Sequence, residues 1–402
     1  MKKRLLCLLL AVCFLLGGCA QGPTDQNAPD GQDPSKDPLL YVPEYEYDDG
    51  GVVTAGEERV AGAADAGLTL GMEQLLLDLQ EYYYRSLSAM KVKDCTDIFS
   101  SVEEAEYHQA VWRSLIAIRN ASLVDLSLVD YCFNLTITDV EWSGEDKVKL
   151  ELLEDAVMNF SITPDVDSEH FDNYHEYTLV RLDDGGWRIA EHYSDDNPYY
   201  NFTYDRDAGQ EAYLDQFLAN VAARQATRAD AGEEVSLTWD HDYDRDAAYA
   251  YMMTYAEKRN DDWDAYDDVG GNCQNFGSQV LHAGGIPMDV EGDARWFWYS
   301  NENQDYSWIN VDLFIAYAGA NEGYGLVADA APNYYDAQVG DILILGDNRY
   351  RHTTEICGRI TDDDGATLDY LLCSNTSNYR NFPASAYYYT LHWPVRIFGW
   401  NE

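Results

Sequence analysis

The sequence predicts an α+β fold, and the prediction depends on how the spacing of apolar residues changes along the chain. Over residues 68–87 the apolar side chains recur at the spacing of an amphipathic helix, and residues 101–120 form a second helical stretch. Over residues 135–152 the period falls to two, which is typical of strands with one buried face. Two later apolar runs flank the sequence Asp-Asp-Gly-Gly at 183–186, a strong β-hairpin signal. Helices followed by antiparallel strands indicate the α+β class.

Length and charge restrict the domain organisation and the partners. The chain has 402 residues, which is too many for one ordinary core, so we expect two or three domains. Lys and Arg total 26 against 72 Asp and Glu, and the formal net charge is −46 at pH 7. Such a surface repels nucleic acid and anionic lipid head groups, so we expect no nucleic-acid partner.

The first residues have the pattern of a bacterial export signal. Three basic residues precede an apolar run over residues 5–16, which is too short to span a bilayer. The run ends with Gly-Gly before Cys19, and this arrangement resembles the lipobox of bacterial lipoproteins, in which the cysteine is lipidated and becomes the first mature residue. The resemblance implies a signal peptide over residues 1–18 and a lipid anchor that holds the protein on the extracytoplasmic face of the cell membrane. The alternative is an ordinary signal peptide with an incidental cysteine.

Composition divides the rest of the chain. Residues 19–65 are rich in Pro, Asp, Gly, Gln and Ala and show no period, which predicts a disordered tether. An α+β unit follows over residues 66–205, then a helical linker over 206–239 and a last unit over 240–402. The order of elements in the first unit is similar to the cone-shaped fold of the nuclear-transport-factor-like, or cystatin-like, superfamily. We expect no catalytic set in this unit and interpret three of its histidines as surface or sheet residues: His170, His175 and His192.

Cys273 is the candidate nucleophile. Gly270 and Gly271 interrupt the chain before it, a helical pattern follows, and Gly284 and Gly285 give a stop signal. The cysteine therefore lies at or near the first turn of a helix, where unpaired N–H groups and the positive end of the helix dipole favour a thiolate. The competing interpretation is a buried cysteine that only packs.

A cysteine nucleophile needs a base, and the base needs a group that fixes its ring. Among the eight histidines, His282 faces the other side of the predicted helix, and His392 in the last strand is the second choice. His352 is the preferred base, because it lies on one strand of a predicted hairpin. Asn375 ends the returning strand, so its side-chain oxygen can accept a hydrogen bond from the imidazole. A surface position for His352 is equally compatible with the sequence.

The residues around Cys273 resemble a known family. The sequence NCQNFGSQ at 272–279, followed by Gly-Gly at 284–285, resembles the motif of the bacterial "putative amidase domain" family. Other residues occupy matching places in the motif order: 243–250, 307–310, 340–341 and His352. That family is similar to papain-like cysteine hydrolases, including the CHAP amidases of cell walls.

The resemblance implies a papain-like domain over residues 240–402 that hydrolyses amide bonds in peptidoglycan or peptides. Cys273 attacks the carbonyl group as a thiolate, His352 accepts the proton and returns it, and Asn375 orients the imidazole ring. The resemblance implies no cofactor, and the sequence contains no recognised zinc-binding spacing.

Three further residues are expected near the nucleophile. The oxyanion donors are the backbone N–H of Cys273 and one side chain, for which Tyr266 and Asn272 are candidates. Trp308 is expected either in the wall of the substrate groove or in the core.

Two positions depart from the motif of the family. Asn272 stands where the family has Asp, and Gln274 stands where it has Thr. Neither change removes the nucleophile or the base. Both leave open a catalytically inactive lipoprotein that binds cell wall or peptides, and a structural assembly protein is a third possibility.

Overall fold

A computed structural model describes residues 51–56, 58–205, 210–232, 235–291, 294–347 and 349–402. The expected signal peptide at 1–18, the expected lipidation site Cys19 and most of the expected tether lie outside these residues.

The described residues form helices and an antiparallel sheet, which confirms the predicted α+β class. Among these residues, no helix is both long enough and apolar enough to cross a membrane.

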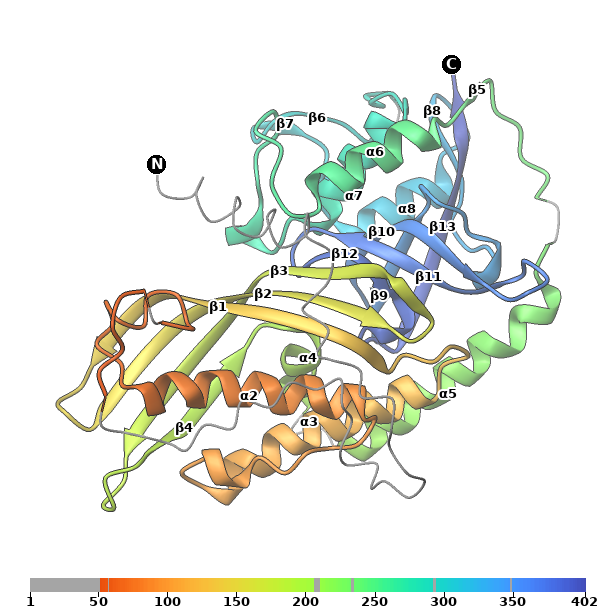
Figure 1. The fold of residues 1–402 in the computed structure, drawn as a ribbon. Helices are drawn as coiled ribbons and strands as arrows, with labels where there is room; N and C mark the ends of the chain where they lie inside the picture. Colours follow the sequence, from red (N-terminus) through yellow and green to blue (C-terminus); the bar gives the residue numbers. More distant parts are fainter. Residues whose placement is uncertain (1–50, 57, 206–209, 233–234, 292–293, 348) are drawn as a thin grey trace. The chain divides into compact units, whose positions relative to one another are not determined.

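The first part of the fold places two helices against one face of a four-stranded meander (Figure 1). The hydroxyls of Thr69 and Ser101 accept hydrogen bonds from backbone N–H groups of the first turns, so they start these two helices. The strands follow with the predicted alternation of buried and exposed side chains, and the predicted hairpin at 183–186 joins the last two. The elements are α2 (Leu70–Ser88), α3 (Val102–Asn120), β1 (Leu128–Trp142), β2 (Lys147–Phe160), β3 (Thr163–Arg181) and β4 (Trp187–Ser194).

Part of the segment expected as a tether is folded. Val53, Val60 and Ala63 are buried in the core, and the backbone N–H of Val60 donates to a carboxylate oxygen of Glu73 on α2 at 2.8 Å. Residues 51–56 and 58–65 therefore belong to the packed structure, because they carry the apolar side chains that cover the start of α2.

Two helices connect the first and last parts of the fold. They are α4 (Asn197–Asp205) and α5 (Gln210–Ala226), and α5 lies within the segment 206–239 that was expected as a helical linker. Asn197 and Asn201 of α4 bind the backbone of Tyr388 near the C-terminus, and Tyr388 stacks on Tyr213 of α5 at 5.5 Å between ring centroids. These contacts hold the connecting helices against the last part of the chain.

In the residues that the structure describes, the last part contains three α-helices and all the remaining strands. Its helices are α6 (Arg245–Tyr255), α7 (Cys273–Ala283) and α8 (Val311–Ala320). Its strands are β5 (His241–Asp242), β6 (Trp298–Ser300), β7 (Asn303–Gln304), β8 (Gly325–Asp329), β9 (Ile342–Gly346), β10 (Tyr350–Thr361), β11 (Thr367–Ser374), β12 (Asn378–Pro383) and β13 (Leu391–Asn401).

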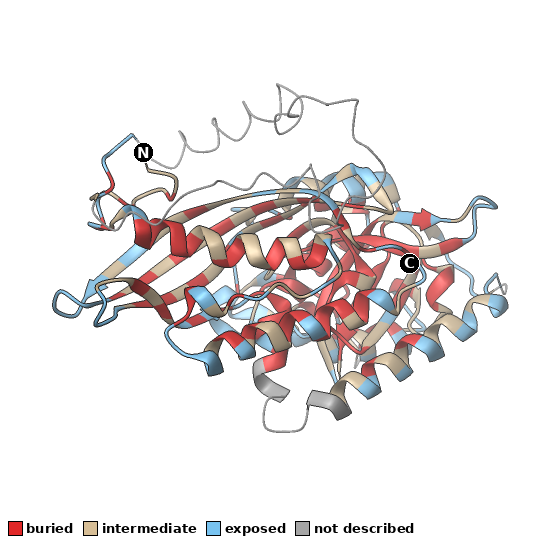
Figure 2. Ribbon diagram, turned by 60° about the horizontal axis from the view of Figure 1, so that its bottom comes forward, coloured by how far each residue is buried: buried red, intermediate tan, exposed pale blue. Residues whose placement is uncertain are grey.

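One sheet runs through both parts of the fold. Its order is β1-β2-β3-β12-β11-β10-β9-β13-β5, with β4 paired to β3 and β8 paired to β13. The junction is the antiparallel pair β3–β12, in which Tyr379 lies opposite His170 and Arg380 forms an ion pair with Glu169. The two predicted units therefore share a sheet, and buried residues continue along it on both sides of the junction (Figures 1 and 2).

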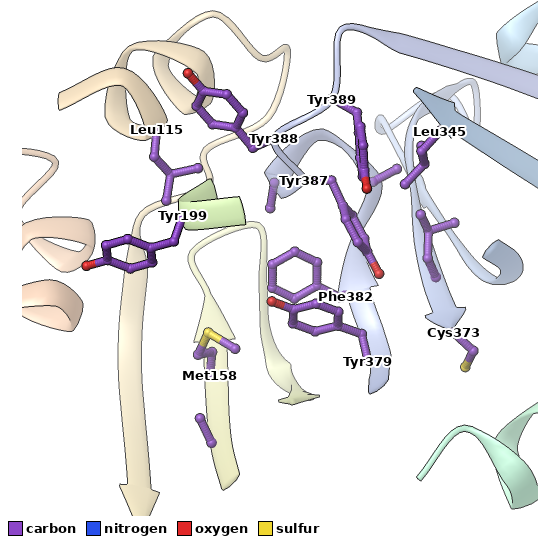
Figure 3. Close-up of a cluster of buried hydrophobic side chains, with 14 of the residues drawn as sticks. Leu115, Met158, Tyr199, Leu345, Cys373, Tyr379, Phe382, Tyr387, Tyr388 and Tyr389 are labelled. Carbon is purple, nitrogen blue, oxygen red and sulfur yellow. The ribbon is translucent and has the colours of Figure 1, made fainter. Parts of the chain in front are cut away.

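Strand β10 presents alternate side chains to two different environments. Thr353 and Glu355 face α7, since the Thr353 hydroxyl donates to Gln274 at 2.7 Å and both side chains lie against Gly277. His352 lies opposite Leu345 of β9 and therefore faces the other side of the sheet. That side carries the aromatic cluster with Tyr387, Tyr389 and Phe382 that Figure 3 shows. This alternation determines which groups meet the candidate nucleophile.

Candidate active site

Helix α7 begins at Cys273, as the glycine signals predict. Gly270 and Gly271 have φ values of 125° and 103°, a region that favours glycine, and they turn the chain sharply into the helix. A Cβ on Gly271 would also lie 3.3 Å from the Thr376 hydroxyl. The turn therefore places the thiol at the first helical position, where backbone N–H groups lack helical partners.

The Asn272 side chain braces the turn before the nucleophile. Its Oδ1 accepts hydrogen bonds from the Tyr266 N–H at 3.1 Å and from Asn275 Nδ2 at 2.8 Å. Its Nδ2 donates to Asn375 Oδ1 at 2.6 Å, and its backbone N–H donates to the Thr376 hydroxyl at 2.6 Å. Asn272 was expected as an oxyanion donor, but these four contacts give it a positioning role in the structure.

The Cys273 thiol is buried, with 7% of the residue exposed. Burial raises the pKa of the thiol, and the nearby Glu355 carboxylate raises it further. The backbone N–H groups of Thr353 and Gln274 act in the opposite direction, because they donate to the sulfur and stabilise its charged form. Backbone N–H donors at the site therefore favour a thiolate. Among the described residues, no cation contributes to the pKa of this thiol.

Among the described residues, no hydrogen bond or ion pair joins His352 to Cys273. Its ring lies 6.2 Å from that of Tyr387 and 6.3 Å from that of Tyr389, between centroids, on the face of β10 opposite α7. Burial lowers the pKa of His352 to about 4, and its Nε2 has no hydrogen-bond partner within the described part of the chain. The expected thiolate–imidazolium pair is absent from this arrangement, because neighbouring residues on a strand point to opposite faces.

Asn375 is close to the nucleophile turn and not to His352. Its Nδ2 donates to the carbonyl oxygens of Tyr255 at 2.8 Å and Ala256 at 3.3 Å, at the end of α6. Its Oδ1 accepts from Asn272. Among the described residues, no hydrogen bond joins it to the imidazole that it was expected to orient, because Asn375 points to the α6 and α7 side of the sheet.

His392, the second candidate base, also lies away from α7. It lies opposite Leu345 of β9, which is also the cross-strand partner of His352, so both histidines share one face of the sheet. Burial and the positive charge of Arg224 hold the pKa of His392 well below its ordinary value.

Tyr266 and Trp308 support the helix from the other side. The Tyr266 hydroxyl accepts from Trp298 Nε1 at 2.8 Å and lies 2.8 Å from Gln304 Oε1, so it fixes the β6–β7 hairpin to the turn before α7. Trp308 is completely buried, and its Nε1 donates to Asn275 Oδ1 at 3.0 Å. Of the two positions considered for Trp308, the structure shows the core position.

Glu355 is the residue at this site that sequence reasoning missed. It is completely buried on the α7 face of β10, and neither carboxyl oxygen has a hydrogen-bond partner within the described residues. Burial raises the pKa of this carboxyl well above its ordinary value. The signal in the sequence was a lone acid within a strand of apolar and β-branched residues, three positions after His352.

The three histidines of the first part that were expected as surface or sheet residues lie on β3 and β4, and they are buried. His175 Nε2 lies 3.1 Å from Glu154 Oε2, and His175 Nδ1 lies 3.0 Å from His192 Nε2. His170 stacks on Tyr379 across the β3–β12 junction at 4.0 Å between centroids. The surface position that was the other expectation does not occur, because the helices α2 and α3 cover this face of the strands.

Besides the nucleophile, a metal centre or a hollow of the surface could mark a functional site. The described residues contain no group of three or more His, Cys, Asp or Glu side chains placed to hold a metal ion. A hollow of the surface lies elsewhere, and its lining includes Tyr335, Gln338, Arg359, Arg396 and Phe398. Among the described residues, its lining contains no cysteine, serine or histidine, so the Cys273 region at α7 is the better candidate site than the hollow.

Comparison with known proteins gives the class of the last part. The sequence model of the family described as "Putative amidase domain" matches residues 242–396. This match covers most of the predicted unit at 240–402 and supports amidase-like hydrolysis at a general level. The part of the chain that carries Cys273 is therefore similar to an amidase domain, as the motif predicts.

One particular relative is the uncharacterized protein YhbB of Bacillus subtilis (strain 168). It is 33% identical over 121 residues, which are 29% of this chain and 38% of that protein. The chain thus matches well under half of the length of this relative.

Two solved structures resemble the chain weakly. The intermembrane space region of the chloroplast protein ARC6 is 15% identical, with a TM-score of 0.22 over 31% of this chain and 92% of that one. A protein from Novosphingobium aromaticivorans described as "Putative Scytalone Dehydratase" is 12% identical, with a TM-score of 0.22 over 32% of this chain and 87% of that one. Similarity at this level does not support a fold assignment. Membership of the cone-like superfamily therefore stays a prediction.

Proposed function

We propose that the chain is a cysteine amidase in which Cys273 attacks the carbonyl carbon of an amide bond. The observation that carries the proposal is the position of this thiol at the first residue of α7, within the region that matches the amidase family. The backbone N–H groups of Thr353 and Gln274 already point at the sulfur, which favours its charged, nucleophilic form.

The reaction proceeds in two steps. The thiolate forms a C–S bond, the carbonyl electrons move to oxygen, and collapse of the intermediate breaks the C–N bond as the leaving amine takes up a proton. Water then attacks the thioester and gives one proton to the base, the C–S bond breaks, and the carboxylic acid leaves as the thiolate is regenerated. Free N–H groups at the start of α7 are suited to stabilise the oxyanion in both steps.

The proposed proton acceptor is His352. Among the described residues no hydrogen bond joins its ring to Cys273, so the proposal requires the ring to approach the thiol during turnover. A β-bulge between Tyr350 and His352 interrupts the pairing with β9 directly before the histidine, and bulges of this kind change the direction of side chains beside active sites. Asn375 supports the nucleophile turn in this proposal through Asn272.

The proposed substrates are peptidoglycan or extracellular peptides, and the proposed location is the extracytoplasmic face of the cell membrane. The support for the location is the lipobox-like sequence before Cys19. The net charge of −46 supports a substrate other than nucleic acid.

A non-catalytic protein that binds cell wall or peptides is the second candidate. The observations that favour it are the burial of Cys273 and His352 and the absence of a contact between them in the described structure. This candidate predicts that the protein cosediments with peptidoglycan and that replacing Cys273 leaves that binding unchanged.

The two candidates differ in one experiment. Full-length protein and its Cys273→Ser variant are incubated with purified peptidoglycan and with a peptide mixture, and released fragments are identified by mass. New amine and carboxyl ends formed by the parent protein alone support the amidase. Equal release by both proteins, or cosedimentation without release, contradicts it.

A further inference from the structure

Glu355 lies beneath the first turns of the nucleophile helix. A Cβ added at Gly277 would lie 3.0 Å from Glu355 Oε1 and 2.8 Å from the Thr353 methyl group. Cys273 precedes Gly277 by four residues, so the two positions are neighbours on the same side of α7. The missing side chain at Gly277 therefore provides the space in which the carboxyl group approaches the helix that carries the thiol.

No base accompanies this carboxyl. The titratable groups whose charges act on it or feel its charge are Cys273 of α7, Cys373 directly opposite on β11, and the phenols of Tyr243 and Tyr387. Within the described residues, no arginine, lysine or histidine forms an ion pair or hydrogen bond with Glu355. All four neighbouring groups are neutral when protonated, so none can compensate for a negative charge.

A buried carboxylate without a partner is costly, so the group retains its proton over a wide range of pH. When the proton leaves, the negative charge acts on the nearest groups. Its effect on Cys273 is to oppose a second negative charge on the sulfur. Ionisation of the Glu355 carboxyl and ionisation of the Cys273 thiol therefore oppose each other.

We infer that Glu355 is a positioning residue whose charge state sets how readily Cys273 becomes a thiolate. The inference rests on the proposed function of Cys273 as a nucleophile. With Glu355 protonated, the N–H donors of Thr353 and Gln274 and the start of α7 stabilise the thiolate without opposition. With Glu355 ionised, the thiol is held in its unreactive form.

The test is the rate at which iodoacetamide alkylates Cys273 in the full-length protein, measured by peptide mass from mildly acidic to alkaline pH. Glu355→Gln keeps the shape of the side chain and removes its charge. We expect the variant and the parent to react equally at low pH. As the pH rises the variant should become faster, reaching about tenfold, which corresponds to one unit of thiol pKa.

Two variants separate a charge effect from a structural one. Glu355→Asp keeps a carboxyl group and should retain the slow alkaline reaction of the parent. Glu154→Gln makes the same chemical change at an equally buried acid of the first part, and it should leave Cys273 unaffected. The alkylation rates of Cys357 and Cys373 are measured in the same samples. Iodoacetamide would also label these two cysteines faster if a variant loosened or unfolded the sheet.

Coincident pH profiles for Glu355→Gln and the parent overturn the inference, as does a rate ratio that stays constant with pH. A different result contradicts the proposed function: amide hydrolysis that persists in Cys273→Ser. The alkylation profile needs no substrate, so the two failures are distinguishable.

Discussion

His352 and Glu355 are three positions apart on β10, face opposite sides of the strand, and are both buried without an opposite charge. Burial perturbs them in opposite directions, lowering the pKa of the imidazole to about 4 and raising that of the carboxyl well above its ordinary value. His352 is therefore neutral in the folded protein near neutral pH, and burial favours the neutral, protonated form of Glu355. Neither group compensates for the other because the strand separates them.

The lowered pKa of His352 makes stability depend on pH. The ordinary pKa of histidine is 6.5, so below this pH the ring is protonated in the unfolded chain. In the folded chain the ring stays neutral down to about pH 4, because burial lowers its pKa. This component of stability is present above that window and is lost as the pH falls through it. At pH 5 the loss amounts to about 2 kcal/mol.

We predict that His352→Gln loses about 2 kcal/mol less free energy of unfolding than the parent between pH 7 and pH 5. Chemical denaturation at the two pH values measures the difference. His241→Gln is the control, because the His241 side chain is partly exposed and paired with Glu402, and it should behave like the parent. A parent-like loss in His352→Gln would mean that the ring is not buried in its neutral form.

At the scale of elements, the turn between β11 and β12 ties α6 to α7. Asn375 Oδ1 accepts a hydrogen bond from Asn272 Nδ2 of the nucleophile turn. Asn375 Nδ2 donates to carbonyl oxygens at the end of α6. The next residues, Thr376 and Ser377, have φ values of 74° and 50°, a backbone conformation that is unusual for residues other than glycine. The turn is thus held in place by the contacts that it makes.

We predict that Asn375→Ala lowers the free energy of unfolding by about 1–3 kcal/mol, because it leaves buried polar groups without partners. Thermal and chemical unfolding measure the change, and Asn303→Ala in the exposed β7 serves as a control with little expected effect. Unchanged stability with lost hydrolysis would instead support the orienting role first expected for Asn375.

Local signals in the sequence were sufficient to predict the start of α7. The glycines before and after the helix, together with its apolar spacing, fix where Cys273 lies without help from distant residues. The meander with its 183–186 hairpin was predictable for the same reason, since turn residues and alternation are both local.

The partners of Cys273 were not predictable in this way. The face that His352 occupies depends on a β-bulge two residues earlier, and a shift by one residue reverses every side chain of a strand. The isolation of Glu355 depends on which helices cover β10. The joined sheet depends on pairing between β3 and β12, which are about two hundred residues apart in the chain.

At the scale of the whole molecule, the β3–β12 junction makes the first part of the fold a support for the second. We predict that a fragment of residues 206–402 is less stable and more prone to aggregate than one of residues 51–402. Its β12 loses the partner strand and exposes a pairing edge, and Tyr379 and Phe382 lose their cover from β2 and β3. Size-exclusion chromatography and unfolding curves compare the two, and equal behaviour would show that the junction contributes little.

The proposed anchor gives a second prediction at this scale. We expect the protein to sediment with membranes and Cys19→Ala to release it, because the sequence offers this residue for lipidation. Cell fractionation measures the distribution, and Cys132→Ala, which lies on β1, is a cysteine control that should stay with membranes. Retention of Cys19→Ala after cleavage of the signal peptide would contradict the lipid anchor.

The central claim is that Cys273 forms a covalent acyl intermediate with an amide substrate. The most direct measurement is mass analysis of the full-length protein quenched in acid during incubation with peptidoglycan fragments, because acid preserves thioesters. We predict an acyl adduct that maps to the peptide containing Cys273, with no adduct and no released amine in Cys273→Ser. Substrate turnover in the parent without an adduct, together with undiminished turnover in Cys273→Ser, would contradict the claim.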